Sequence, residues 1–142
     1  MALTRTESQI LWATAASITL SDNNAATSDA IVFDATDIQA AVQVSADNAG
    51  TPAAGDYIDV WVAYTSGDVL GDASDDYDTT EHAEFLGRLN TYATDTPGED
   101  PARRTYDISA APKGIKLIVK GNQTATRNAV IRARLNTQRS SS

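Results

Sequence analysis

Four segments of the chain alternate apolar and polar side chains with a period of two residues. They span residues 38–47, 57–66, 114–121 and 129–138. In the last segment Ile131 and Ala133 fall on one side, while Arg132 and Arg134 fall on the other. Successive side chains of a strand point to opposite faces of a sheet, whereas a helix repeats about every 3.6 residues. The alternation therefore predicts strands that bury one face and expose the other.

Turn-forming residues separate these segments from further extended stretches. Additional strands are expected over residues 10–20, 30–34, 81–92 and 103–109, of which 81–92 also fits a short helix. The connections between them are rich in glycine, proline, aspartate and asparagine. About eight strands joined in this way are typical of an antiparallel β-sandwich of the Greek-key or jelly-roll kind. The sequence thus predicts an all-β fold.

We expect the 142 residues to form one domain with two short polar ends. Residues 1–9 are polar and are expected to form an N-terminal arm. Residues 10–138 are expected to form the sandwich, and residues 139–142 a polar tail. Hydrophobic residues make up 42% of the chain, which suffices for a core and exceeds what a disordered chain carries.

Charge is distributed unevenly along the chain. Up to Gly87 there are 15 acidic residues and one basic residue, which gives a net charge of −14. From Arg88 onward there are 10 basic and four acidic residues, which gives +6 and brings the whole chain to −8. Such asymmetry concerns association rather than fold. It predicts a molecule whose acidic and basic regions can meet copies of itself or a charged partner.

The composition also argues against several classes of protein. An isoelectric point near 4.4 is the wrong sign for nucleic acid as the main partner. The absence of cysteine excludes disulfides and thiolate metal sites. No apolar run approaches the ~18 residues of a transmembrane helix. The first 20 residues lack the pattern of a signal peptide. We therefore expect no nucleic acid, no membrane and no secretory route.

The densest group of carboxylates lies in one expected loop. Within 14 residues it contains Asp68, Asp72, Asp75, Asp76, Asp78 and Glu81. Calcium takes about six to eight oxygen ligands, and clustered carboxylates repel one another unless a cation lies between them. Asp72, Asp75, Asp76 and Asp78 are therefore candidate calcium ligands, although their spacing differs from that of an EF-hand loop. The alternative is a solvated loop at the end of the sandwich, without any cofactor.

The sequence lacks the signature of an enzyme. His82 is the single histidine, and Glu81, Glu84 and Ser74 lie near it without a G-x-S-x-G turn. Residues 95–98 differ from the Asp-Thr-Gly of aspartic proteases by an inserted proline and have no second copy. We predict a turn there and a protein without catalytic residues.

A candidate contact surface lies on the outward faces of the last two strands. Lys116 and Lys120 point outward on one strand, and Arg132 and Arg134 on the other. If these strands pair, the four cations form one basic patch that fits an acidic surface of another copy or of a carrier protein. Complementary patches favour head-to-tail contacts, which close into rings when the rotation permits. The alternative is a solvated sheet face of mixed charge.

Trp61 is a further candidate contact residue. It lies on the more polar face of the strand over residues 57–66. A large indole ring at such a position is expected to pack against a loop or a neighbouring subunit.

Two stretches resemble small virion structural proteins of tailed bacteriophages. They are residues 81–92 (EHAEFLGRLNTY), which run into 95–105 (DTPGEDPARRT), and residues 127–138 (RNAVIRARLNTQ). The resemblance implies a β-sandwich that coats or cements a capsid, with the major capsid protein or other virion proteins as partners. It also implies a protein that is made in the host cytoplasm and acts in the virion as a homo-oligomer. The family contributes contact rather than chemistry, so no functional residue is carried over.

Two other functions fit the same residues. The first is a tail or connector component of a virion, which the sequence does not separate from a head decoration protein. The second is a calcium-dependent carbohydrate-binding module. In that module the acidic loop would hold the ion, and Trp61, Tyr77 or Tyr92 would stack on sugar rings.

Overall fold

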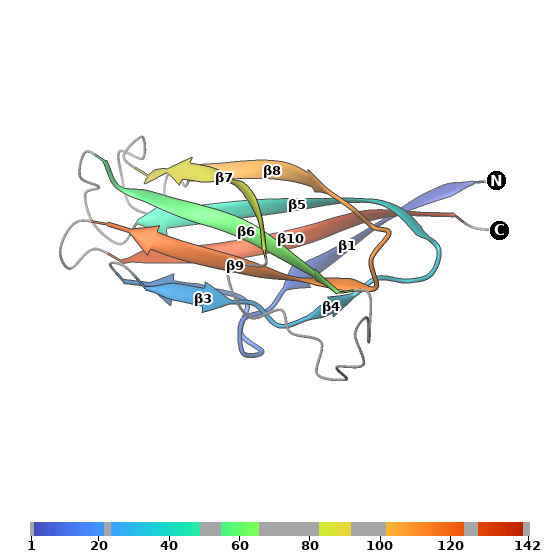
Figure 1. Cartoon of the computed structure of the whole chain (residues 1–142), viewed down its shortest axis with the longest axis horizontal. Helices are drawn as coiled ribbons and strands as arrows, with labels where there is room; N and C mark the ends of the chain where they lie inside the picture. The colour runs from blue at the N-terminus through green and yellow to red at the C-terminus, as the bar shows by residue number, and fades with distance from the viewer. Residues whose placement is uncertain are drawn as a thin grey trace.

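The part of the chain that the structure describes consists of ten β-strands and their connections, without an α-helix. The computed structural model describes residues 2–21, 24–48, 55–65, 83–91, 102–123 and 128–140. The strands are β1 (Leu3–Ile10), β2 (Ile18–Leu20), β3 (Ala25–Thr27), β4 (Ile31–Val32), β5 (Asp37–Asn48), β6 (Tyr57–Thr65), β7 (Glu84–Asn90), β8 (Ala102–Ile108), β9 (Gly114–Asn122) and β10 (Ala129–Ser140). They form two antiparallel sheets of five strands each (Figure 1). The predicted all-β sandwich is confirmed.

The strand order is that of a jelly roll. Sheet I has the order β1-β10-β5-β8 with β2 also paired to β10, and sheet II has the order β3-β9-β6-β7 with β4 also paired to β9. β1 and β2 pair with successive parts of β10, and β3 and β4 with successive parts of β9, so each pair is one interrupted edge strand. Counted in this way, the strand positions follow the order 1-8-3-6 in sheet I and 2-7-4-5 in sheet II.

The core lies between the sheets and is built by the predicted alternation. Its buried members include Ala40, Val42, Val44 and Ala46 from β5, Ile58, Val60 and Val62 from β6, Ile115, Leu117 and Val119 from β9, and Ala129, Ile131, Ala133 and Leu135 from β10. Full burial of each larger aliphatic side chain contributes about 1.5–3 kcal/mol. Ile118 departs from the pattern, because it lies on the outward side of β9 and is nonetheless only 3% exposed.

The described residues near both ends of the chain belong to strands rather than to an arm and a tail. Leu3 to Ile10 pair with β10 along its whole C-terminal part, from Leu3 opposite Ser140 to Ile10 opposite Ala133. The segment is polar because β1 is an edge strand whose two faces are both largely exposed. Arg139 and Ser140, expected in the polar tail, continue β10 (Figure 1).

The structure corrects two local expectations and decides between the two alternatives for residues 81–92. Residues 10–20 do not form one strand, because a tight turn around Ala13 and Thr14 interrupts them. The segment 21–29, which connects two of the expected strands, itself contains the short strand β3. Residues 84–90 form strand β7 and not a helix, since they pair with β6 along their length.

Ser28 and Asp29 form hydrogen bonds at the points where the two edge strands are interrupted. We call these two residues the edge junction. The Asp29 carboxylate accepts hydrogen bonds from the backbone N–H groups of Ala13 (3.0 Å) and Thr14 (2.9 Å). Ser28 donates its backbone N–H to the Leu117 carbonyl (2.8 Å), and its Oγ accepts the Leu117 N–H (2.9 Å). Asp29 therefore stabilises the turn between β1 and β2 at the edge of sheet I. Ser28 bonds the Leu117 backbone of β9 between β3 and β4, at the edge of sheet II.

The turn that Asp29 holds is strained. Ala13 and Thr14 have φ angles of 48° and 68°. Left-handed backbone costs an L-residue about 1–2 kcal/mol. We expect Asp29→Ala to lower the free energy of unfolding by about 1–2 kcal/mol, because two turn N–H groups lose a charged acceptor. Thr14→Gly should raise it by about 1 kcal/mol, because glycine adopts this backbone without strain.

Urea denaturation of both variants beside the unsubstituted chain measures the two effects. Equal stability of Asp29→Ala and the parent, or a loss of stability in Thr14→Gly, would contradict this account of the junction.

Candidate docking face

The outer face of sheet I is a continuous polar surface, which we call the docking face. Alternate residues of its strands point into the core, so those between them point outward in rows across the sheet. Register places the rows as Arg5–Gln138–Gln39, Glu7–Asn136–Ala41–Asp107, Gln9–Arg134–Gln43–Thr105 and Arg132–Ser45–Arg103. The face thus combines side-chain amides, hydroxyls and guanidinium groups, and these rows contain no aromatic side chain.

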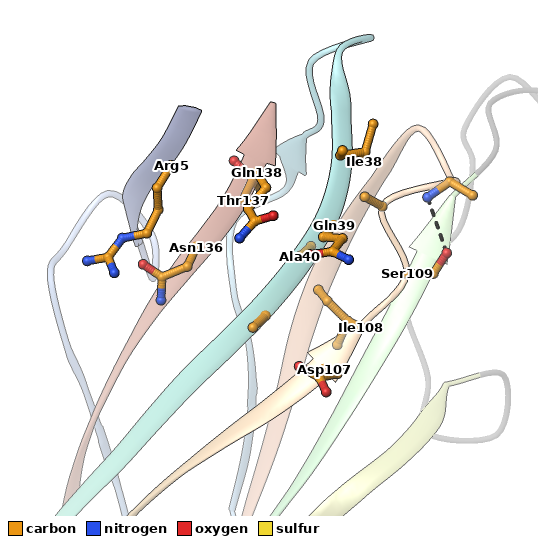
Figure 2. Close-up of a pocket in the computed structure, with 13 residues that line it drawn as sticks. Arg5, Ile38, Gln39, Ala40, Asp107, Ile108, Ser109, Asn136, Thr137 and Gln138 are labelled. Carbon is orange, nitrogen blue, oxygen red and sulfur yellow. Dashed lines mark hydrogen bonds between the residues drawn. The ribbon is translucent and has the colours of Figure 1, made fainter. Parts of the chain in front are cut away.

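A groove of about 590 Å³ crosses this face near the two chain termini (Figure 2). Gln39, Asn136 and Gln138 line its middle, with Arg5 and Asp107 on opposite sides. Each amide offers both donors and acceptors. The Oδ1 atom of Asn136 is buried and accepts no hydrogen bond from the described residues. We call this hollow the amide groove; its chemistry suits a partner that both donates and accepts hydrogen bonds.

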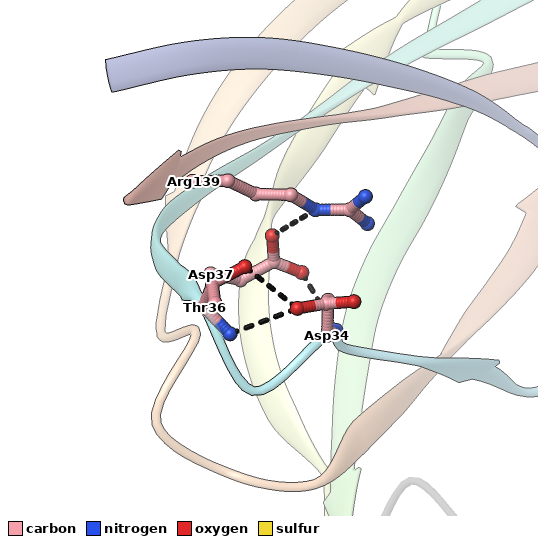
Figure 3. A network of polar contacts seen from close by, with 4 residues as sticks. All are labelled: Asp34, Thr36, Asp37 and Arg139. Atoms are coloured by element: carbon pink, nitrogen blue, oxygen red, sulfur yellow. Dashed lines mark hydrogen bonds and ion pairs between the residues drawn. The ribbon is translucent and has the colours of Figure 1, made fainter. Parts of the chain in front are cut away.

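A network of polar contacts fixes the strand ends beside the amide groove (Figure 3). The Asp37 side chain is only 1% exposed and accepts hydrogen bonds from Arg139 Nε (2.6 Å) and the Asp34 N–H (2.9 Å). The Thr36 hydroxyl and N–H donate to the Asp34 carboxylate at 2.6 and 2.9 Å, and these bonds lower the pKa of Asp34. The hydrogen bond to Asp37 raises the pKa of Arg139. The network anchors the start of β5 to the end of β10.

A second, smaller hollow of about 210 Å³ lies toward the other end of the docking face. Its cationic members are Arg103, Arg132 and Arg134, and Gln9, Gln43, Ser45 and Ala133 complete its lining. Arg132 and Arg103 face one another across Ser45 in a single row of the sheet. Arg134 forms a 3.4 Å ion pair with Glu7. We call this site the arginine hollow.

The predicted patch of four cations does not exist as one surface. Lys116 and Lys120 lie on β9 in sheet II, whereas Arg132 and Arg134 lie on β10 in sheet I. β9 pairs with β3, β4 and β6, and the chain crosses to the other sheet before β10 begins. The third cation beside Arg132 and Arg134 is instead Arg103 of β8. Its outward position follows from the alternation of residues 103–109, but its place beside β5 depends on pairing that period alone does not reveal.

Trp61 shares the outer face of sheet II with the two lysines. It lies opposite Ile118, whose neighbours on that side of β9 are Lys116 and Lys120. Its ring meets that of Phe85 edge to face, with centroids 5.5 Å apart. Within the described residues, the aromatic partner of Trp61 is thus Phe85 of the adjacent strand β7. A contact of Trp61 with another subunit stays a prediction.

An ion pair flanks this aromatic pair. Arg88 donates to the two carboxylate oxygens of Asp59 at 2.7 and 3.1 Å and lies 3.5 Å from the centre of the Tyr57 ring. The hydrogen bond to Asp59 raises the pKa of Arg88. The Arg88 guanidinium group is therefore already paired with Asp59 and the Tyr57 ring. Phe85 is the more exposed aromatic side chain on this face.

The candidate calcium ligands Asp72, Asp75, Asp76 and Asp78 lie outside the described residues, as do His82, Tyr77 and Tyr92. Among the residues that the structure describes, no three acidic or histidine side chains are grouped so that they could hold a metal ion. The same residues contain no helix that is long and apolar enough to cross a membrane.

Fold and face together define a jelly-roll sandwich with one extended polar surface. Neither a protein-family model nor a curated protein matches the sequence. Among solved structures, the infectious bursal disease virus VP2 subviral particle matches with a TM-score of 0.50 at 12% identity, over 95% of this chain and 32% of that one. The acidic stable capsid of Helicobacter pylori bacteriophage KHP30 matches with a TM-score of 0.46 at 18% identity, over 96% and 93%.

A third match is the carbohydrate-binding module CBM36 in complex with calcium and xylotriose. Its TM-score is 0.46 at 12% identity, over 91% of this chain and 97% of that one. Identities this low concern the fold alone. The VP2 match, at a TM-score of 0.50, agrees with the sandwich fold described above.

The network behind the amide groove predicts a stability effect. Asp37→Ala should lower the free energy of unfolding by about 1–3 kcal/mol, because the Asp34 N–H and Arg139 lose a buried charged acceptor. Asp107→Ala, on the exposed docking face, should change it by less than about 0.5 kcal/mol. Urea denaturation near neutral pH measures both. Equal effects of the two substitutions would show that the network does not anchor the strand ends.

Proposed function

We propose that this chain is a non-enzymatic structural protein of a tailed-bacteriophage virion, and specifically a decoration (cement) protein of the head shell. The observation that carries the proposal is the docking face, which spans β1, β10, β5 and β8 with amides and arginines. Specific interfaces contain about one hydrogen bond per 100–200 Å² in addition to packing. A face this rich in bidentate donors and acceptors suits such contacts, with the major capsid protein or another virion protein as partner.

The mechanism is stabilisation by binding to the assembled state. A protein that binds across the joint between two shell subunits, and not to separate subunits, shifts the equilibrium toward the shell by mass action. At a free concentration of about 100 times Kd the gain is about 2.7 kcal/mol for each site. No bond is made or broken, which agrees with the absence of a catalytic signature in the sequence.

A tail or connector component would use the same face in the same way. The two assignments differ in where the protein lies in the particle, and labelling of intact virions by an antibody against this chain separates them.

The docking face supplies the test of shell binding. Gln39→Arg places a long cation in the amide groove and should weaken co-sedimentation with undecorated head shells by at least about tenfold, the equivalent of 1.4 kcal/mol. The matched control is Ala25→Arg, which adds the same side chain at an exposed position of β3 on sheet II and should bind normally.

Two results would contradict the proposal. One is an unsubstituted chain that stays in the supernatant with every shell preparation. The other is equal loss of binding in both variants.

A calcium-dependent carbohydrate-binding module is the second candidate. The observation in its favour is the Phe85 ring, which is 53% exposed beside Trp61 on the outer face of sheet II. Exposed aromatic rings offer the flat apolar surface on which a sugar ring can stack. Asp72, Asp75, Asp76 and Asp78 stay the proposed calcium ligands in this case.

This candidate predicts that calcium raises the melting temperature, by mass action on the folded state, and that EDTA reverses the rise. Asp75→Asn with Asp76→Asn should abolish the shift, and Phe85→Ala should abolish sugar binding while leaving the calcium shift intact. Calorimetric titration and thermal melts measure these effects. No heat with calcium and no effect of EDTA would remove the candidate.

A further inference from the structure

The arginine hollow concentrates positive charge that the described part of the chain does not neutralise. Of its three guanidinium groups, Arg134 alone has an ion pair among the described residues, at 3.4 Å to Glu7. Strands in a sheet lie about 4.8 Å apart, so Arg132 and Arg103, on either side of β5, are about 10 Å apart at their Cα atoms. The short side chain of Ser45 forms the floor between them. This geometry leaves room for a carboxylate between two guanidinium groups.

The other carboxylates of the docking face do not alter this charge. Glu7 already contacts Arg134, and Asp107 lies in the amide groove two rows away. Asp47 follows Ser45 on the outward side of β5 and has an interaction of its own. Guanidinium groups bind carboxylates through paired, charge-assisted hydrogen bonds. The hollow therefore suits an acidic peptide segment that presents several carboxylates in succession.

The chain itself contains one such segment. Residues 68–81 contain six carboxylates and no basic residue. In the sequence it follows β6. This strand begins at the end of the sandwich where β10 begins and runs toward the end where the chain termini lie (Figure 1). The nine residues of β6, at about 3.4 Å each, place Thr65 about 27 Å from its start.

Thr65, the last described residue before the acidic segment, and the arginine hollow lie toward different ends of the sandwich. Thr65, which precedes the acidic segment, pairs with Gly114 in sheet II, near the end where the chain termini lie. The arginine hollow lies on the outer face of sheet I, toward the other end. Two copies arranged head to tail bring the acidic segment of one to the hollow of the next. A heterologous contact of this kind closes into a ring or continues as a filament.

We infer that the arginine hollow binds the acidic segment 68–81 of a second copy of this chain, and that this contact builds a head-to-tail homo-oligomer. The inference rests on the proposed structural function, for which it names the partner of one surface. Self-association is measured with the protein alone, without head shells. A failure of self-association and a failure of shell binding are therefore separate results.

Self-association in solution tests the inference. Sedimentation velocity of the unsubstituted chain should show oligomers at low ionic strength, and their share should fall as salt screens the exposed charges. Arg103→Glu with Arg132→Glu should weaken association by at least about tenfold, because several exposed ion pairs of about 0.2–1 kcal/mol each are lost or reversed. The matched control, Lys120→Glu, reverses an exposed charge on sheet II and should associate normally.

A charge exchange identifies the occupant. Asp75→Lys with Asp76→Lys should weaken association in an otherwise unsubstituted chain. It should restore association when mixed with, or combined with, the Arg103→Glu and Arg132→Glu variant. A chain that is monomeric at low salt overturns the inference, since the acidic segment then binds within its own copy or elsewhere. Association that is indifferent to the arginine reversal, or weakened equally by Lys120→Glu, overturns it as well.

Discussion

The hydrogen bonds of Asp29 to a strained turn connect the two sheets at the point where both edge strands are broken. The turn places Trp12, which is 1% exposed and is the largest fully buried side chain of the described residues. Trp12 also forms the turn's own backbone pair, donating to the Ala15 carbonyl at 2.8 Å. Ser28, one residue away, completes the partnering of β9. Two adjacent polar residues thus stabilise an edge of each sheet and the aromatic side chain that fills the core between them.

The sequence predicted the core far better than the edges, for a physical reason. Central strands such as β5 and β10 bury one face along most of their length, so they alternate clearly between Val44 and Gln43, or between Ile131 and Arg132. Edge strands are short or exposed on both faces, and β1 and β3 carry no such contrast. These edge strands form because the backbone N–H and C=O groups of β10 and β9 pair with them. No local pattern in residues 1–9 or 21–29 predicts this strand pairing.

The candidate site shows the same limit at longer range. Period two assigned Arg132, Arg134, Lys116 and Lys120 to outward faces correctly, yet it could not say which sheet each strand would join. In a jelly roll, consecutive strands often belong to opposite sheets, so β9 and β10 are neighbours in sequence and not in pairing. Arg103, far from Arg132 in sequence, became its neighbour because both β8 and β10 pair with β5. Surface charge clusters therefore follow from topology, which local sequence does not contain.

The two hollows of the docking face differ in the kind of contact they can make. The polar lining of the amide groove consists mostly of neutral side chains, which lie among alanine and isoleucine residues. Hydrogen bonds to these neutral groups depend on close geometry and respond little to salt. The arginine hollow carries charge, which acts over about a Debye length, roughly 8–10 Å at physiological ionic strength, and guides approach before contact. One face can therefore combine a geometrically demanding contact at one end with a salt-sensitive contact at the other. The two proposed contacts, with a neighbouring copy and with a shell, call for such a difference, because identical chemistry at both ends would let either surface bind the wrong partner.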